Sequence, residues 1–128
     1  MPPETVTTRT ATIWLRDDGI VQIVIFPNAA EGQADAQTNV ATCFRVGGER
    51  RRPVLVDVRQ MKGFEREARV YYSSEETAQI ITALGLLVGS PLSRVLANFF
   101  LGLNRVRVPT KLFISEEKAV EWLKGFSE

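Results

Sequence analysis

Two apolar segments of the chain, residues 53–56 and 83–88, are each followed directly by charged or hydroxyl side chains that could bind an anion. A Gly-Ser pair at the start of a helix leaves free backbone N–H groups facing a ligand, and arginine or lysine supplies the countercharge. A simpler interpretation is preferred, in which the serine only caps a helix and the aspartate pairs with an arginine or a backbone N–H group. The side chains concerned are Asp57, Arg59 and Lys62 after the first segment, and Gly89, Ser90 and Arg94 after the second.

The composition argues against most catalytic chemistry. The chain has no histidine, which removes Ser-His and Cys-His nucleophiles and histidine-ligated metals. No Gly-x-Ser-x-Gly, P-loop or dinucleotide-binding motif occurs, and the carboxylates fall mainly on predicted helix surfaces, where water solvates them. We therefore predict no catalytic residue, no metal site and no cofactor, and we expect a protein that is not an enzyme.

Charge and cysteine content limit the expected partners and the cellular location. Lysine and arginine number 16 against 15 acidic residues, a formal net charge of +1, so we expect no nucleic-acid binding. The N-terminal residues lack the apolar core of a signal peptide, and the apolar run 83–88 is too short for membrane insertion. The single cysteine excludes an internal disulfide, and we expect a cytoplasmic protein.

The polar residues named above need a scaffold, and the sequence predicts one built around a short central strand. Residues 54–58 are apolar except for Asp57, which is the pattern of a strand buried on both faces of a parallel sheet. Asp57 stands near the carboxyl end of this strand, where α/β sheets usually keep their functional groups. Residues 10–16 and 20–26, separated by the turn Asp17-Asp18-Gly19, predict an antiparallel hairpin ahead of it.

Amphipathic helices alternate with the remaining strands. The helix predicted over residues 33–47 carries Cys43 on its apolar face, so this thiol should be buried and inert. A second helix is predicted to begin near Phe64 and to restart at Ser73-Ser74-Glu75-Glu76, where the sequence has the form of a capping box. Later patterns predict a strand over 83–88, a helix from Pro91 to about 103, a strand over 111–114 and a final helix capped by Ser115.

This order of elements indicates a single α/β domain over residues 1–128, with a mostly parallel sheet of about five strands and with about four helices. Residues 1–8 are expected to form a flexible tail. We expect the helices to cover mainly one face of the sheet. The other face then needs side chains or a partner to cover it, and a homodimer is one such arrangement.

Short motifs along most of the chain form a recognisable series, namely Val54–Arg59, Gly89-Ser90-Pro91, Ala97–Phe100, Pro109–Phe113 and Glu116–Leu123. The series resembles the SpoIIAA-like branch of the STAS fold, whose bacterial members have a similar VDxR strand, NFF helix and PTxxF…EEAxxWL ending. The resemblance implies the SpoIIAA-like fold, which is related in turn to the lipid-binding CRAL-TRIO domains. It implies no particular activity, since fold does not fix function.

One position departs from the anti-sigma-factor antagonists of the same fold. Those proteins follow the central strand with an Asp-Ser pair, and a partner kinase phosphorylates the serine. The corresponding position here is about Glu65-Arg66, and an arginine cannot accept a phosphate. The resemblance therefore implies a domain without the usual phosphoacceptor, and Ser73 and Ser74 come too late in the chain to replace it.

Three functional hypotheses remain. The first is a regulatory module that binds a protein partner through the loop and helix after the central strand. The second is a domain that binds a small molecule, lipid or anion, with a pocket at the carboxyl edge of the sheet or one lined by Phe99 and Phe100. An enzyme is ranked last. The predicted binding residues are Asp57, Arg59, Lys62, Phe64, Arg66, Gly89, Ser90 and Arg94.

Overall fold

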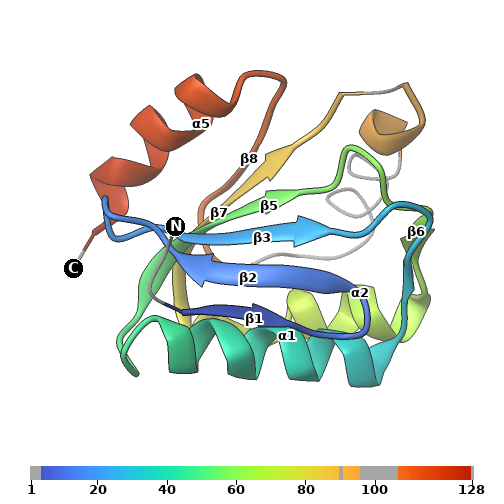
Figure 1. The fold of residues 1–128 in the computed structure, drawn as a ribbon, viewed down its shortest axis with the longest axis horizontal. Coiled ribbons are helices and arrows are strands. Elements are labelled where there is room, and N and C mark those ends of the chain that lie inside the picture. Colours follow the sequence, from blue (N-terminus) through green and yellow to red (C-terminus); the bar gives the residue numbers. More distant parts are fainter. Residues whose placement is uncertain (1–3, 90, 96–106, 128) are drawn as a thin grey trace.

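The computed structural model describes residues 4–89, 91–95 and 107–127, and its centre is a six-stranded sheet (Figure 1). Strands β1, β2 and β3 pair antiparallel, whereas β3, β5, β7 and β8 pair in parallel. This confirms the predicted α/β domain with an N-terminal hairpin. In spatial order the strands are β1 (Thr5–Thr7), β2 (Ala11–Leu15), β3 (Val21–Ile25), β5 (Arg52–Asp57), β7 (Ile81–Leu87) and β8 (Thr110–Phe113).

Strand β5 lies inside the sheet, between β3 and β7, as predicted from its apolar sequence. Its side chains enter two separate hydrophobic clusters. Leu55 packs with Leu87 in one cluster, and Val54 and Val58 belong to the other. Burial on both faces explains why this segment is apolar at successive positions. Asp57 ends the strand at the carboxyl edge of the sheet.

Helices lie on both faces of the sheet, whereas the sequence led us to expect them mainly on one face (Figure 1). Helices α1 (Gln33–Val46) and α2 (Arg66–Tyr72) lie on one face, and α5 (Glu116–Leu123) lies on the other and continues into the 3-10 helix η1 (Lys124–Phe126). Residues 91–95 are also helical. The remainder of the helix predicted from Pro91 to about 103, with Phe99 and Phe100, lies outside the described residues.

The start of α2 differs from the prediction. Phe64 belongs to the short strand β6 (Gly63–Phe64), which pairs in parallel with β4 (Ala30–Glu31) in a separate two-stranded sheet. This pairing holds Phe64 in an extended conformation, and the backbone N–H of Glu65 donates to the Glu31 carbonyl at 2.8 Å. The helix therefore begins at Arg66 rather than near Phe64.

The predicted break after α2 is confirmed. A further short helix, α3 (Glu75–Ala78), follows at once, and Ser74 is its N-cap residue. The Ser74 hydroxyl accepts the backbone N–H of Thr77 at 3.3 Å. Ser73 is buried, and its hydroxyl donates to the Arg69 carbonyl at 2.9 Å.

The N-terminal segment is more ordered than predicted over the residues that the structure describes. Thr5, Val6 and Thr7 form β1 and pair with β2, where a flexible tail over residues 1–8 was expected. The reason is the alternating pattern, which turns Val6 toward the hydrophobic cluster beneath the sheet. Residues 1–3 lie outside the described part of the chain.

Two further expectations concern the interior and the membrane. Cys43 is buried in the cluster between α1 and the sheet, and burial raises the pKa of its thiol to about 12. This confirms the prediction of a buried thiol. Within the described residues, no helix combines the length and the apolar character that crossing a bilayer requires.

Candidate functional site

A hollow opens at the carboxyl ends of β3 and β5, at the edge of the sheet where the sequence analysis placed the functional site. Its volume is about 360 Å³. The predicted site residues Asp57 and Arg59 are both in its wall. We call it the carboxyl-edge hollow, and the residues that line it are Val24, Ile25, Phe26, Pro27, Asp57, Arg59 and Gln60.

Asp57 and Arg59 form a doubly hydrogen-bonded pair in this wall. Arg59 Nε donates to Asp57 Oδ1 at 3.0 Å, and Arg59 Nη2 donates to Asp57 Oδ2 at 2.7 Å. The backbone N–H of Arg59 also donates to Asp57 Oδ1, at 3.0 Å. The Asp57 carboxylate raises the pKa of the Arg59 guanidinium, chiefly through the side-chain hydrogen bonds, so the arginine remains a cation. This is the local pairing that the simpler interpretation predicted.

Gly89, which follows strand β7, lies against the side chain of Arg59. A Cβ atom on Gly89 would lie 3.1 Å from both Cγ and Cδ of Arg59, so the arginine stem rests where a larger residue would crowd it. The side chain of Arg59 nevertheless keeps 48% of its surface exposed. Within the described residues its Nη1 group makes no hydrogen bond. Arg59 is therefore held on one edge of its guanidinium and open to solvent on the other.

The backbone N–H of Gly89 does not serve as a free anion donor. It donates to the hydroxyl of Ser93 at 3.2 Å, and Ser93 is buried. Ser90, which the sequence analysis expected at this helix start, lies outside the described residues. The Gly89 N–H group is thus not available to bind an anion. The guanidinium of Arg59 still is.

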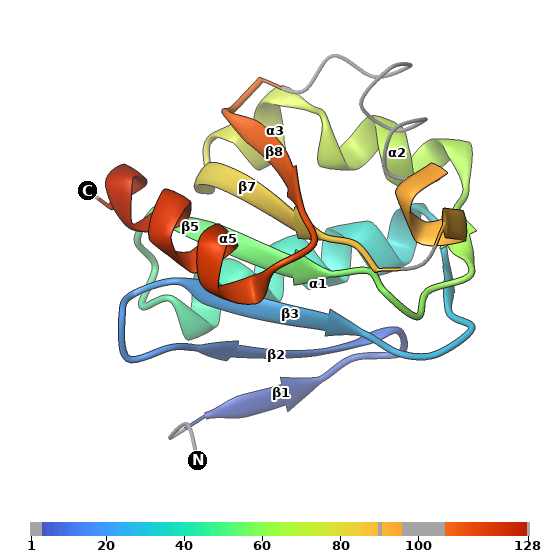
Figure 2. The same cartoon turned by 90° about the horizontal axis from the view of Figure 1, so that it is seen from above.

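Exposed side chains of two kinds follow the strands that end at this edge of the sheet. Lys62 and Arg94 are exposed cations. Leu92 and Val95 are exposed apolar residues, with 60% and 63% of their surface accessible. Figure 2 shows the helical residues 91–95 (orange) beside the loop between β5 and β6, at the same end of the sheet. Charge and apolar surface are thus combined at this edge.

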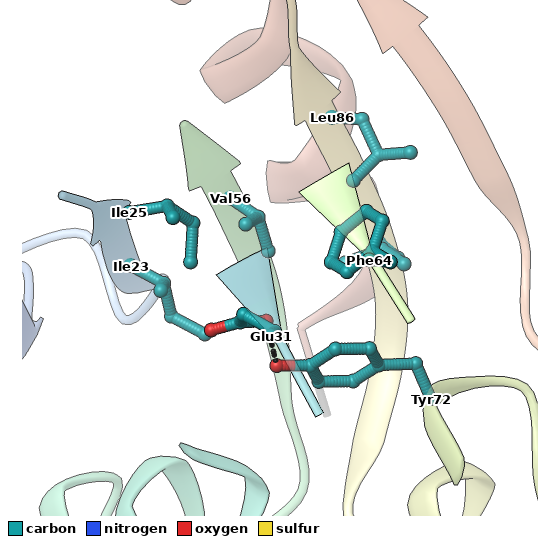
Figure 3. A pocket seen from close by; sticks show the side chains of 8 residues that line it. Ile23, Ile25, Glu31, Val56, Phe64, Tyr72 and Leu86 are labelled. Atoms are coloured by element: carbon teal, nitrogen blue, oxygen red, sulfur yellow. Dashed lines mark hydrogen bonds between the residues drawn. The ribbon is translucent and has the colours of Figure 1, made fainter. Parts of the chain in front are cut away.

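A second, smaller space lies between the sheet and α2, and its volume is about 30 Å³ (Figure 3). That is room for one water molecule or one methyl group. Phe64, a predicted site residue, lines this space rather than the carboxyl-edge hollow. We call it the α2 slot, and the residues that line it are Ile23, Ile25, Glu31, Val56, Phe64, Tyr72, Leu84 and Leu86.

Among the described residues that line the α2 slot, Glu31 is the one acidic or basic side chain. Its side chain is fully buried. Oε2 of the carboxylate accepts hydrogen bonds from the Thr10 hydroxyl at 2.5 Å and from Asn39 Nδ2 at 2.7 Å. Oε1 accepts a hydrogen bond from the Tyr72 hydroxyl at 2.5 Å (Figure 3). The three donors are all neutral. They come from Thr10 just before β2, from α1 and from α2, so the carboxylate connects three parts of the fold.

Burial dominates the ionisation of this network. Removal from water raises the pKa of Glu31, although the hydrogen bonds from Thr10, Tyr72 and Asn39 act in the opposite direction. Burial also raises the pKa of Tyr72 well above its ordinary value, and the Glu31 carboxylate adds to this effect. The Tyr72 hydroxyl therefore stays protonated and acts as a donor.

The remaining predicted residues are distributed around these two spaces. Arg66 starts α2 and lines a third hollow of about 220 Å³, formed mainly by α2 and by Gln33 at the start of α1. The structure thus brings Asp57, Arg59 and Gly89 together, with Lys62 and Arg94 at the same edge. It separates Phe64 and Arg66 from them.

The network around Glu31 was not predicted from the sequence. Its members are far apart in the chain, and Glu31 itself stands between the predicted hairpin and the first helix. One signal was available. Asn39 is a polar residue on the face of α1 that Ala36, Val40 and Cys43 make apolar, and a polar residue in such a position usually has a buried partner. Among the described residues, no group of three or more acidic, histidine or cysteine side chains could hold a metal ion.

Comparison with known proteins gives a family and a fold. The profile of the domain of unknown function DUF7793 matches residues 13–127. No curated protein matches the chain. An uncharacterised protein of the DUF3478 family with a SpoIIAA-like fold, from Shewanella loihica PV-4, aligns over 94% of this chain and 90% of its own, with 13% identity and a TM-score of 0.53.

This structural likeness confirms the SpoIIAA-like fold that the sequence motifs predicted. A protein of unknown function from Arthrobacter sp. FB24 is also similar, with 34% identity. The alignment covers 92% of this chain and 95% of that protein, with a TM-score of 0.36.

Proposed function

The chain belongs to the DUF7793 family of domains of unknown function, and we propose that it is a non-enzymatic interaction module that binds an acidic, partly apolar surface of another protein. The binding surface is the carboxyl-edge hollow together with the helical residues 91–95. The observation that carries this proposal is the Arg59 guanidinium, fixed by Asp57 on one edge and open to solvent on the other.

A fixed guanidinium suits recognition of a second carboxylate. An arginine that is already held in one rotamer loses less side-chain entropy when it binds, so more of the interaction energy appears as affinity. Asp57 neutralises part of the charge of Arg59, but Lys62 and Arg94 lie exposed at the same edge. Glu116 also acts on Arg59, so among the described residues three cations face two carboxylates at this edge; the excess is positive, and an acidic partner complements it.

The exposed apolar residues favour a protein partner over a free anion. Leu92 and Val95, which follow β7 at the same end of the sheet, each expose more than half of their surface. Exposed apolar side chains with charged neighbours are typical of protein interaction sites. No catalytic step is part of the proposal, because Asp57 already accepts hydrogen bonds from Arg59 and the chain has no histidine.

The alternative is a small anionic or lipid ligand in the hollow itself. Its volume of about 360 Å³ falls within the range of ligand pockets, about 300 to 1,000 Å³. This alternative uses the same Arg59 cation but does not need Leu92 or Val95. Substitution of the apolar residues therefore separates the two possibilities.

Site-specific photo-crosslinking tests the proposal. A benzoylphenylalanine replaces Gln60 in the wall of the hollow, and a matched control replaces Arg50, which is exposed at the opposite end of β5. In cells of the source organism we expect one defined protein to be crosslinked at Gln60 and not at Arg50. Arg59→Ala together with Arg94→Ala should remove most of that product, and Leu92→Ala with Val95→Ala should reduce it.

Other results point elsewhere. A partner crosslinked at Arg50 alone, or a yield at Gln60 that ignores both double substitutions, contradicts the proposed surface. Native mass spectrometry that finds a bound molecule of low mass, lost on substitution of Arg59 but not of Leu92 and Val95, favours the ligand alternative. A crosslink between two copies of the chain would make the partner a homodimer.

A further inference from the structure

We propose that Glu31 is a proton-controlled latch on α2: its ionisation favours an opening in which residues 63–72 move away from the sheet and uncover the α2 slot. The structure contains both a buried titratable group and a direct hydrogen bond between that group and α2. Glu31 is fully buried and its carboxylate accepts the Tyr72 hydroxyl at 2.5 Å, so α2 is fastened directly to the group that titrates. This inference is independent of the proposed partner surface.

The segment that would move packs against α1 and β4 and lies outside the main sheet. Of the seven residues of α2, all of which are described, Ala68 is the one fully buried. Strand β6 belongs to the two-stranded sheet with β4 and not to the main sheet. The opening therefore breaks the β4–β6 pairing and the packing of α2 on α1 but no hydrogen bond of the six-stranded sheet, so it costs less than global unfolding.

Tyr72 and Phe64 form the outer wall of the α2 slot. Their rings meet edge to face, with centroids 5.6 Å apart and an interplanar angle of 73°. Figure 3 shows both rings facing Ile23, Ile25 and Val56, which project from the sheet. When residues 63–72 move, the apolar slot and the Glu31 carboxylate are exposed together.

The charges that face Glu31 from the neighbouring elements do not compensate it. From α1 come Asp35, whose negative charge opposes ionisation, and Cys43, whose thiol is neutral because burial raises its pKa. Ahead of β2, Arg9 acts on Glu31 at a distance, but its guanidinium is bound to Asp35 at 2.5 Å. Tyr72 of α2 is a neutral donor.

Just before α2, Glu65 adds a second negative charge near Arg9. The buried carboxylate is thus surrounded by neutral donors and by a cation that is shared with other acids. In the closed state, ionisation is less favourable than in water, mainly because of burial.

Linkage gives the direction of the effect. In the open state water reaches Glu31, so ionisation becomes easier there than in the closed state. Rising pH therefore shifts the equilibrium toward the open state, by at most about tenfold for each pH unit over which one proton is released. Falling pH closes the segment. The effect ends once Glu31 is ionised in both states.

Amide hydrogen exchange on the full chain measures this opening. Protection factors, which compare each rate with that of an unstructured peptide at the same pH, are recorded between about pH 5 and pH 8. For residues 69–72 we expect protection lower than that of β5 at every pH, and falling as the pH rises. In Glu31→Gln the protection of residues 69–72 should be independent of pH.

Two further variants keep the test decisive if Glu31→Gln folds poorly. Tyr72→Phe removes one hydrogen bond and keeps the titrating group, so it should lower the protection of residues 69–71 at all pH values and retain the pH dependence. Asp57→Asn, which removes a carboxylate of the other site, should leave the pH dependence unchanged. The inference is overturned if wild-type residues 69–72 are as protected as β5, or show no pH dependence. It is also overturned if Asp57→Asn abolishes the dependence.

Discussion

The carboxyl-edge hollow and the α2 slot each contain one carboxylate, and the protein treats the two in opposite ways. Asp57 has a cationic partner two residues away, and that partner remains half exposed. Glu31 has three neutral partners from three different parts of the fold and no exposed surface. At the edge of the sheet the charge of Arg59 is still accessible to a binding partner, whereas the buried Glu31 interacts only with other parts of the fold.

The energetics follow from this difference. Asp57 is itself mostly buried, but water reaches the half-exposed Arg59 and screens the pair, so we expect the pair to contribute about 1 kcal/mol to stability. In the α2 slot the surroundings are apolar. A buried donor or acceptor that loses its hydrogen-bond partner there costs about 1 to 3 kcal/mol of stability, because it has been removed from water without compensation. Equal chemical changes at the two places should therefore have very unequal effects on stability.

The largest contrast is expected when a charge is introduced at each place. Val56→Asp puts a second carboxylate into the α2 slot beside Glu31, on the strand in the middle of the sheet. We expect a loss of about 4 kcal/mol or more, enough to unfold most of the domain. Gln60→Asp, at the exposed rim, should change stability by less than about 0.5 kcal/mol. Thermal melts followed by circular dichroism measure both, and similar melting temperatures for the two variants would contradict the contrast.

A smaller contrast is expected when one hydrogen-bond partner is removed from each carboxylate. Asn39→Ala deletes a buried donor to Glu31 and also leaves the Thr8 hydroxyl without the Asn39 acceptor. The expected loss is about 2 to 3 kcal/mol. Arg59→Ala removes the partner of Asp57, which water can then reach, and should be within about 1 kcal/mol of wild type. Urea unfolding gives both free energies. An equal loss in the two variants would show that the Asp57–Arg59 pair contributes as much to stability as the buried Glu31–Asn39 hydrogen bond.

These contrasts also explain which parts of the molecule the sequence predicted. The fold could be predicted from local patterns, because apolar strands and amphipathic helices can each be recognised within a short stretch of consecutive residues. The Asp57–Arg59 pair was foreseeable for the same reason, since its members are two residues apart. The start of α2 was misplaced because the pairing of Phe64 with Glu31 is a contact between distant segments, and no local pattern reports it.

The Glu31 network lay beyond reach for a further physical reason. A buried polar group is stabilised only when its donors converge from separate elements, and their convergence depends on the packing of the whole domain. Thr10, Glu31, Asn39 and Tyr72 each look ordinary in sequence. Their juxtaposition follows once α1, α2 and the residues just before β2 are placed.

A third prediction uses pH to separate two acids that are close in sequence. Burial raises the pKa of Glu31, so its contribution to stability is complete below its unfolded pKa of about 4.3 and declines as the pH rises through its folded pKa. The hydrogen bonds from Arg9 lower the pKa of Asp35, so its contribution is complete above about 3.9 and declines in acid.

Stability curves between about pH 3 and pH 8 should therefore fall on both sides of an acidic maximum. Glu31→Gln should flatten the decline on the neutral side, and Asp35→Asn should flatten the decline in acid. We expect the effect of Asp35→Asn to be the smaller of the two, because its partner Arg9 is exposed and water screens the pair. If Glu31→Gln instead flattens the acid side, the sign assigned to Glu31 is wrong.

The smallest expected change in stability, with a local effect that should still be measurable, comes from Gly89→Ala. The new methyl group would lie 3.1 Å from Cγ and Cδ of Arg59, which is tighter than an ordinary contact. The arginine stem is flexible and can shift by a few tenths of an ångström, so stability should stay within about 0.5 kcal/mol of wild type. The shift should nevertheless loosen the hydrogen bonds between Arg59 and Asp57. Exchange of the Arg59 Nε hydrogen with water, followed by NMR, reports this loosening and should become faster. Gly125→Ala is the matched control, because a Cβ atom there meets no other atom within 4 Å. If Arg59 Nε exchanges at the same rate in both variants, Gly89 does not help to fix the guanidinium, and the preorganised cation at the carboxyl-edge hollow depends on Asp57 alone.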